Sequence, residues 1–452
     1  MVEKVIILPS VKPSTPKTAR GRQQNRWRYV SGLIAALVCA LVWGLPASSQ
    51  GAGFALVQQG AAAMAQGNAF VAEADDPPAI FYNPAGLIQL KRPEIYWGKF
   101  FQYPDREYHA PGGTVSETQP RFYWSSSLFM TYPVNDRVAL GVGVFAPFGL
   151  GSVWPASWEG RYITTFSRLK TYNVNPVISL KLSDKLSIGG GVNILWSEVR
   201  IKRRVPVVIP PGVVLPDGEA ALEGHGTGFG ANLGILYEPI EGIKLGASYR
   251  SQVYVRHTGN LKTSLPIRIP GLRYSIDGSA KLIFPPSVNF GISISRLPRF
   301  TFNLDATWTG WSTYDELKIN LSQPLLVNKQ LVSSLVTEKN WRDAWAIRFG
   351  MNFQVKDHTK LRVGYTYDMT PVPDSTFEPQ VPDANRHIFA VGSELKIWRL
   401  TLGIAYNYIL FEPRTKNNLI ATNGVPLPVA FQANGKYRSD NHSLGLSTSF
   451  RF

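Results

Sequence analysis

The chain has 452 residues, a formal net charge of +16 and a mean hydropathy of −0.07. This hydropathy is too polar for a helical membrane protein, and the basic residues are scattered, which argues against nucleic-acid binding. The one cysteine, Cys39, lies in the N-terminal leader, so a mature chain without the leader would have no disulfide and no cysteine-bound metal.

The first predicted segment is a signal peptide over residues 1–49. Its front part, residues 1–28, is basic, an apolar run follows over Val30–Leu45, and small residues come directly after that run. The run is shorter than the roughly 20 apolar residues that a membrane-spanning helix needs. Cleavage after Ser49 and cleavage after Gly51 both satisfy the preference for small residues.

Residues 50–93 differ in composition from the rest of the chain. They are rich in alanine and favour helix, and they contain the dipeptide Asn83–Pro84. This dipeptide predicts a turn, because proline fixes its own φ while the asparagine amide can bond nearby backbone. We predict that the segment, called the hatch below, is mainly helical and fills the lumen of the barrel formed by residues 94–452.

Residues 94–452 show the alternation of β-strands. Over Val288–Ile294 and Phe300–Trp308, large apolar residues occupy every second position and small polar residues stand between them. This pattern is typical of a membrane β-barrel with a hydrated interior, although a soluble sandwich shows it with the faces exchanged. About fourteen such segments occur: 94–103, 121–132, 137–148, 168–182, 185–203, 226–237, 243–257, 278–295, 299–319, 342–355, 360–368, 386–396, 400–411 and 436–452.

The connections and the C-terminus favour the membrane barrel. Short turns such as Ser183–Asp184 alternate with long connections such as 204–225, as in barrels with periplasmic turns and outer loops. The last strand ends in Phe452, which resembles the terminal strand that outer-membrane barrels present to their assembly machinery. The sequence therefore predicts an all-β, antiparallel transmembrane barrel of about 14 strands, monomeric, in the outer membrane of a Gram-negative-type bacterium and in contact with its lipid.

Tryptophans stand near the ends of several predicted strands. Aromatic girdles at membrane interfaces use such residues, and ordinary core packing is the alternative. The tryptophans concerned are Trp308, Trp311, Trp341, Trp345 and Trp398.

The chain also resembles the FadL/TodX family of outer-membrane channels for long-chain fatty acids and other hydrophobic compounds. The matching segments follow one another along nearly the whole mature chain: 52–54, 81–87, 146–150 with Trp154, Trp158 and 160–162, 173–176, 308–312, 340–343, 367–373 and 382–387. The resemblance implies passive uptake in three stages, which are an outer groove, a tighter internal site near the start of the hatch, and lateral release beside a kinked third strand. The hatch residues that would control passage are Phe54, Asn83, Pro84 and Ala85.

Pro147, Phe148 and Gly149 are the candidates for the lateral opening. Proline cannot donate a hydrogen bond to a β-ladder, and Gly149 permits unusual backbone angles. The alternative is that Pro147 only marks the end of a strand, as prolines often do.

Three outer connections are unexpectedly apolar, 205–215, 265–272 and 321–336, and exposed apolar patches usually bind something. We expect them to capture hydrophobic molecules, with mutual packing of the loops as the alternative. The candidate groove residues are Val207, Val208, Ile209, Val213, Val214, Leu215, Ile267, Ile269 and Leu272.

Three arginines stand at inward positions of their predicted strands: Arg250, Arg348 and Arg362. They could bind the carboxylate of a fatty acid, since a buried carboxylate must be paired. Pairing with the hatch acids Glu73, Asp75 and Asp76 is a second possible role of these arginines. Capping of a turn is the alternative role of the three acids.

Two other classes of protein compete with the channel for hydrophobic molecules. A general porin would have charged loops and no hatch of forty residues. An outer-membrane hydrolase would need a nucleophile and a base close together, but the six histidines are dispersed and no catalytic motif is present. We therefore expect no catalytic residues, no metal and no cofactor.

Overall fold

The computed structural model describes residues 52–209, 212–269, 272–327 and 330–452. The predicted signal peptide and the hatch residues Gln50 and Gly51 lie outside these ranges. The helices of the described residues are short: α2 (Ala61–Ala65), α3 (Ala79–Tyr82), η1 (Pro84–Gln89), η2 (Glu159–Tyr162), η3 (Trp311–Thr313), η4 (Asp374–Thr376) and η5 (Val429–Phe431). None of these helices is long and apolar enough to cross a membrane.

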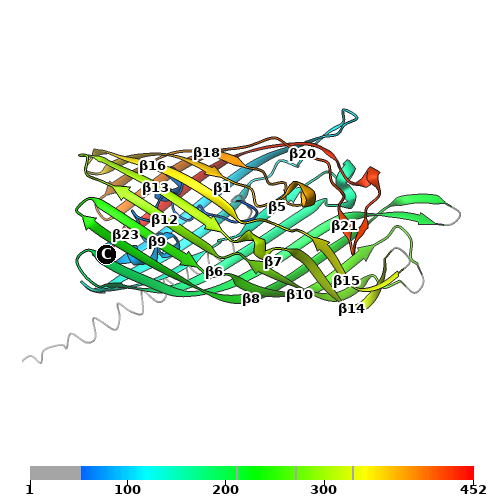
Figure 1. The fold of residues 1–452 in the computed structure, drawn as a ribbon, viewed down its shortest axis with the longest axis horizontal. Coiled ribbons are helices and arrows are strands. Elements are labelled where there is room, and N and C mark those ends of the chain that lie inside the picture. The colour runs from blue at the N-terminus through cyan, green and yellow to red at the C-terminus, as the bar shows by residue number, and fades with distance from the viewer. Residues whose placement is uncertain (1–51, 210–211, 270–271, 328–329) are drawn as a thin grey trace, which may run out of the picture. The chain divides into compact units, whose positions relative to one another are not determined.

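Strands make up most of residues 94–452 (Figure 1). The longer ones are β1 (Glu94–His109), β3 (Tyr123–Asn135), β4 (Val138–Phe145), β5 (Gly149–Val153), β6 (Phe166–Lys181), β7 (Leu186–Ile209), β8 (Val213–Ile240), β9 (Ile243–Arg250), β10 (Val253–Ser264), β11 (Ser275–Phe284), β12 (Ser287–Ile294), β13 (Phe300–Thr309), β14 (Glu316–Val327), β15 (Gln330–Glu338), β16 (Ala344–Lys356), β17 (Thr359–Asp368), β18 (Arg386–Ile397), β19 (Leu400–Phe411) and β23 (Gly435–Arg451). Short pieces are β2 (Val115–Glu117), β20 (Arg414–Lys416), β21 (Ala421–Thr422) and β22 (Val425–Pro426).

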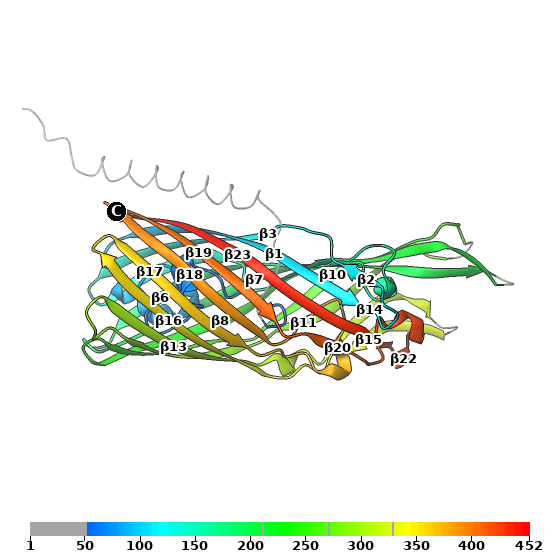
Figure 2. The same cartoon turned by 90° about the horizontal axis from the view of Figure 1, so that it is seen from above.

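Fourteen strands form a closed antiparallel wall, as the sequence predicts. Their order is β1, β3, β4, β6, β7, β8, β9, β12, β13, β16, β17, β18, β19 and β23, and β23 pairs with β1 to close the ring. Figure 2 shows β1, β23 and β19 side by side where the ring closes. A closed ring leaves no unpaired edge, which a sheet inside hydrocarbon cannot tolerate.

The apolar face of the wall points outward. Phe290 and Ile292 on β12 are 52% and 41% exposed, while Asn303 and Asp305 on β13 are each 1% exposed on the inner face. Apolar side chains on the outside and polar side chains on the inside are the arrangement of a membrane barrel, and a soluble sandwich has the reverse. The alternation in the sequence therefore predicts the two faces of the wall correctly.

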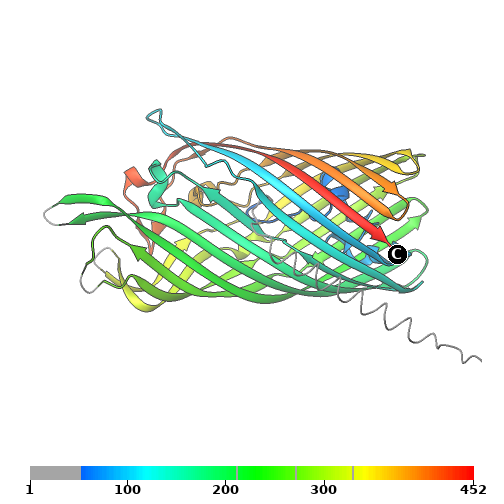
Figure 3. The same ribbon diagram turned by 180° about the vertical axis from the view of Figure 1, so that it is seen from behind.

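The two ends of the barrel differ in their connections. Short turns gather at the end that holds the C-terminus, whereas β7 and β8 project from the opposite end as a long hairpin (Figure 3). The sequence predicts a loop over 204–225, but most of it continues the β7–β8 ladder. The run of valines there favours extended backbone, which the hairpin supplies.

The hatch packs against inward-facing glycines of the wall. A Cβ built on Gly364 of β17 would lie 2.1 Å from the carbonyl carbon of Gln66, and one on Gly246 of β9 would lie 2.4 Å from the Val71 oxygen. Glycine lets the hatch backbone touch the wall backbone at these points.

A side chain at Gly364 should therefore displace the hatch while leaving the wall intact. In Gly364→Val the added atoms overlap hatch backbone, so we expect faster proteolysis of the hatch and a larger conductance in planar bilayers. Assembly of the barrel is checked by its heat-modifiable migration in gels. Gly112→Val, at a position where an added Cβ meets nothing within 4 Å, is the matched control. Wild-type conductance and proteolysis in a folded Gly364→Val protein would contradict this view of the hatch.

Candidate functional site

Two cavities inside the barrel lie next to Phe54. The inner cavity has about 980 Å³ of space free of atoms, open solvent included, and is lined by hatch residues such as Leu56 and Tyr82 and by Phe148, Arg250 and Arg348 of the wall. The outer cavity has about 830 Å³ of such space and a mainly apolar lining that includes Phe54, Leu169, Val199, Leu282 and Tyr314. Apolar linings with a few polar groups are typical of sites for small molecules.

Phe54 separates the two cavities. It lines the outer cavity, while its neighbours Ala52, Ala55 and Leu56 line the inner one. Five aromatic side chains surround its ring at centroid distances of 4.6–6.1 Å: Phe148, Phe284, Trp311, Tyr314 and Trp341. The Phe54 ring is therefore held in an aromatic cage at the boundary between the two cavities.

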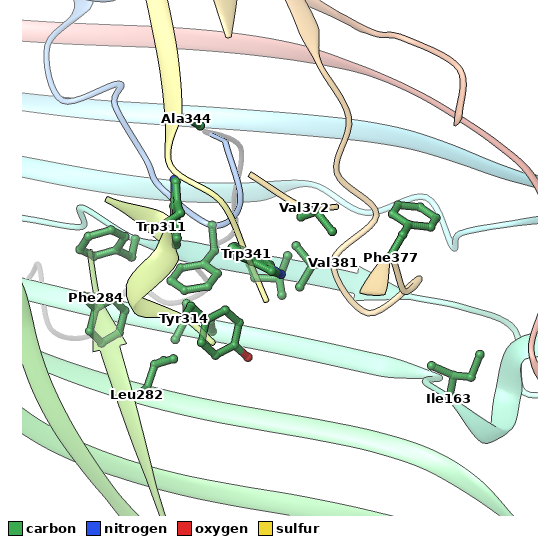
Figure 4. Close-up of a cluster of buried hydrophobic side chains, with 14 of the residues drawn as sticks. Ile163, Leu282, Phe284, Trp311, Tyr314, Trp341, Ala344, Val372, Phe377 and Val381 are labelled. Atoms are coloured by element: carbon green, nitrogen blue, oxygen red, sulfur yellow. The ribbon is translucent and has the colours of Figure 1, made fainter. Parts of the chain in front are cut away.

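Trp311 and Trp341 correct one expectation from the sequence. Figure 4 shows both side chains in the buried cluster with Phe284 and Tyr314, and they are 0% and 5% exposed. They belong to the interior cage and not to a membrane girdle. Trp345 and Trp398 are exposed, at 42% and 83%, as a girdle requires. Alternation alone could not distinguish girdle from interior tryptophans. Trp311 lies in helix η3, after β13 has ended at Thr309, so the period of two no longer tells which way its side chain points.

The start of the described hatch is held by two buried acids. The Ala52 amide donates to Asp368 Oδ2 at 3.2 Å, and the Gly53 amide donates to Asp383 Oδ2 at 3.0 Å. Arg386, 1% exposed, forms ion pairs with both acids. Burial raises the pKa of Asp383, although the charge of Arg386 acts in the opposite direction. These residues therefore fix the position of Phe54.

Asp368, Asp383 and Arg386 lie in the segments that match the FadL/TodX family, 367–373 and 382–387, but the sequence alone predicts no role for them. The closeness of two acids and an arginine within twenty residues was the only feature of the sequence that could have indicated a cluster of charges here. Their partner, the beginning of the hatch, is more than three hundred residues away in the chain, so spacing could not show the contact.

The candidate lateral opening lies at an interruption of the third wall strand. β4 ends at Phe145 and β5 begins at Gly149, and β3 pairs with β4 only as far as Leu128 opposite Val144. The segment Pro147–Gly149 pairs instead with the hatch. The Leu56 amide donates to the Pro147 oxygen and the Gly149 amide donates to the Phe54 oxygen, each at 2.8 Å.

Asn83 forms the turn that the sequence predicts and, in addition, ties the hatch to the wall. Its amide donates to the Val71 oxygen at 2.8 Å and to the Ile235 oxygen of β8 at 2.9 Å, and its Oδ1 accepts a hydrogen bond from the Ala85 amide at 3.2 Å. Pro84 then begins helix η1. The motif therefore supplies both a turn and an anchor.

The three candidate arginines fall into two groups. Arg250 donates to Asn193 and to the Phe81 oxygen, and Arg348 donates to Thr307; both line the inner cavity, and the described residues place neither in an ion pair. Arg362 instead forms an ion pair with Glu394 at 2.9 Å. Arg362 lines a separate polar cavity.

The hatch acids have other partners than the sequence suggests. Glu73 accepts hydrogen bonds from Gln66, Asn303 and Asn352, and Asp75 lies 3.9 Å from Lys360. Burial pushes the pKa of Asp75 upward, but the charges of Lys360 and Arg362 outweigh it, so this pKa lies below its ordinary value. Burial and the nearby Asp75 charge raise the pKa of Asp76.

The candidate groove residues lie on two projections at the outer end of the barrel. One is the tip of the β7–β8 hairpin, where Val208 and Val214 are 59% and 76% exposed, and the other is the connection from β10 to β11, which contains Ile267 and Ile269. None of the nine residues lines the inner or the outer cavity. Among the described residues, no group of three or more His, Cys, Asp or Glu side chains is placed to hold a metal ion.

Comparison with known proteins gives consistent results. A family model described as outer membrane protein transport protein (OMPP1/FadL/TodX) matches residues 45–452. The chain is similar to the long-chain fatty acid transport protein of Salmonella typhi, with 25% identity over 71% of this chain and 78% of that protein. It is also similar to a 47 kDa outer membrane protein of Pasteurella multocida, with 25% identity over 85% of this chain and 91% of that protein.

Two solved structures share the fold. A FadL homologue of Pseudomonas aeruginosa superimposes with a TM-score of 0.76 at 20% identity, covering 89% of this chain and all of that chain. The toluene transporter TbuX of Ralstonia pickettii gives 0.67 at 18% identity, covering 87% and 98%.

Removal of the charges that hold the hatch should loosen its first residues. In Asp368→Asn/Asp383→Asn, the amides of Ala52 and Gly53 lose charge-assisted hydrogen bonds, each contributing about 1.5–3 kcal/mol. We expect a cysteine introduced at Ala55 to react with a maleimide severalfold faster in this variant than in the parent. Asp374→Asn, which removes an exposed acid that pairs with Arg414, is the control. Equal labelling rates in all three proteins would show that the two acids do not restrain the hatch.

Proposed function

Because the chain belongs to the OMPP1/FadL/TodX family of outer-membrane transport proteins, we propose that it is a channel for the passive uptake of hydrophobic molecules. The observation that carries this proposal is the pair of internal cavities divided by Phe54, one of them mainly apolar. A general porin has no need of an aromatic cage across its lumen. Two of the relatives named above are a fatty acid transport protein and a toluene transporter, in agreement with a role in transport and not in catalysis.

Capture is the first step of the proposed route. The apolar hairpin tip around Val208 and Val214 and the connection containing Ile267 would gather dilute molecules from water. Burial contributes about 0.8 kcal/mol for each methylene, so a long acyl chain gains several kcal/mol from even partial coverage. The molecule would then enter the outer cavity, whose lining includes Leu169, Val199 and Leu282.

Displacement of Phe54 is the second step. Its edge-to-face contacts each contribute about 0.5–1.5 kcal/mol beyond simple burial, so a ligand must replace several such contacts to move it. A hydrophobic ligand in the outer cavity touches the same aromatic side chains and can do so. Because Ala52 and Gly53 precede Phe54 directly, their hydrogen bonds to Asp368 and Asp383 limit how far the ring moves.

Lateral release is the third step. The hatch occupies the edge of the kinked strand through the bonds of Leu56 to Pro147 and of Gly149 to Phe54. Movement of Phe54 would break the second of these bonds and free the segment Pro147–Gly149. A molecule in the inner cavity, which Pro147 and Phe148 line, could then pass into the membrane between β3 and β5.

A bulky side chain at the kink tests this route. Gly149→Trp should abolish uptake of a radiolabelled long-chain fatty acid by whole cells, because the indole fills the space through which the ligand would leave. The amount of assembled, heat-modifiable barrel should stay unchanged. Gly112→Trp, in the exposed connection after β1, should transport normally. Normal uptake by a folded Gly149→Trp protein would count against lateral release.

The arginines of the inner cavity test the class of cargo. If the cargo is a fatty acid, Arg250 and Arg348 would meet its carboxylate, and Arg250→Gln/Arg348→Gln should weaken binding of the acid by about tenfold or more. Binding of the alcohol of equal chain length should not change, and isothermal titration of the purified protein measures both. Arg362→Gln, whose parent residue pairs with Glu394, is the comparison variant. Unchanged affinity for the acid in the double variant would indicate an uncharged hydrocarbon as the cargo.

A further inference from the structure

Three cations stand next to one another on the outward side of β10, β11 and β14, the strands that extend the wall from β8. Arg256 of β10 lies directly opposite Lys281 of β11 in the ladder. Ala280 pairs with Ile319 of β14, so the same register continued by one residue places Lys318 beside Lys281. All three side chains are exposed. We call them the basic row.

The basic row faces away from the lumen. Val255 and Leu282, the sequence neighbours of Arg256 and Lys281, are buried in the interior cluster that contains Phe54. Leu317 and Ile319, on either side of Lys318, line the outer cavity. Since neighbouring residues of a strand point to opposite faces, the three cations must point to the outside of the barrel.

The row lies where the apolar band of the wall ends. Leu245 and Tyr249 on β9 are exposed and apolar or aromatic, and Tyr254 follows on β10 as the last aromatic residue before Arg256. The ammonium group of Lys281 lies 4.5 Å from the centre of the Tyr254 ring. Aromatic rings mark the headgroup level of a membrane protein, so the cations are at the depth of lipid headgroups. They are on the side of the long connections, which is the outer leaflet.

The charges of the basic row are not neutralised by carboxylates. On the neighbouring strands three outward cations are paired, Arg168 with Glu198, Arg200 with Glu223 and Lys202 with Glu219, at 2.6–2.7 Å. The described residues form no ion pair with any member of the row. The acids Asp277 and Glu316, on the same faces of β11 and β14, lie four and two residues away along the chain and are not paired with it.

Like charges directly opposite each other in a ladder destabilise it unless an anion is shared between them. We propose that the basic row is a binding site for the phosphate groups of a phosphorylated glycolipid in the outer leaflet. The guanidinium of Arg256 can bind a phosphate through two parallel hydrogen bonds, while the two lysines act as point charges. The acyl chains of the same lipid would lie along the apolar band next to Tyr254 and Tyr249. This site is separate from the transport route, because it is on the opposite side of the wall from both cavities.

The test compares binding of two lipids and one free anion to the full mature protein in detergent. Native mass spectrometry would measure bisphosphorylated lipid A, the same lipid after enzymatic removal of its phosphates, and inorganic phosphate as a competitor. The variant is Arg256→Gln/Lys281→Gln/Lys318→Gln. The control, Lys91→Gln/Arg92→Gln/Arg296→Gln, removes equal charge from the end of the barrel that carries the short turns.

We expect the row variant to bind bisphosphorylated lipid A at least about tenfold more weakly than wild type, since each basic residue near a charged surface contributes appreciably. The control variant should bind like wild type, and the dephosphorylated lipid should bind all three proteins equally. Should the triple variant fail to assemble, Lys281→Gln alone is expected to weaken binding severalfold.

Two results would overturn the proposal. Equal binding of bisphosphorylated lipid A by wild type and the row variant would show that the row does not hold the lipid. Displacement of the lipid by inorganic phosphate at equal concentration would show a site for free anions, without a contribution from the acyl chains.

Discussion

Complete pairing of backbone polar groups is the constraint on which this structure depends. Inside hydrocarbon each unpaired N–H or C=O costs several kcal/mol, so the sheet must close on itself, as it does where β23 meets β1. The constraint also governs the one place where the third wall strand is interrupted. There the hatch takes the role of a neighbouring strand, through the bonds of Leu56 and Phe54 to Pro147 and Gly149.

This substitution of hatch for strand connects the fold to the proposed transport. Phe54 is at once a backbone partner of the kinked strand and the side chain that divides the cavities. In the proposed route, a ligand that favours the displaced position of Phe54 over the caged one would shift the balance between a sealed and an open wall. The shift in the free energy of opening equals the difference between the binding free energies of the ligand for the open and the sealed state. Tight binding to both states alike would leave the wall closed.

Most of the wall could be predicted from the sequence, because a period of two is a local property and each strand displays it independently. Val288–Ile294 shows it as clearly in the sequence as in the exposures of Phe290 and Ile292. The hatch was predicted from its break in that pattern, and the turn at Asn83 from the chemistry of its side chain. Partners across the lumen could not be predicted. Trp311, Glu73 and Asp368 each owe their role to a contact with a distant part of the chain, for which alternation and spacing carry no signal.

The first residues of the hatch are synthesised early, but the residues that hold them are synthesised late. Ala52 and Gly53 precede every strand of the wall, yet the acids that hold them follow 316 and 330 residues later. Closing so long a loop is entropically unfavourable until the intervening chain is organised. The beginning of the hatch therefore stays without these two partners until β17 and the segment before β18 are in place. The first residues of the hatch can thus take their final position only after most strands of the wall have been synthesised.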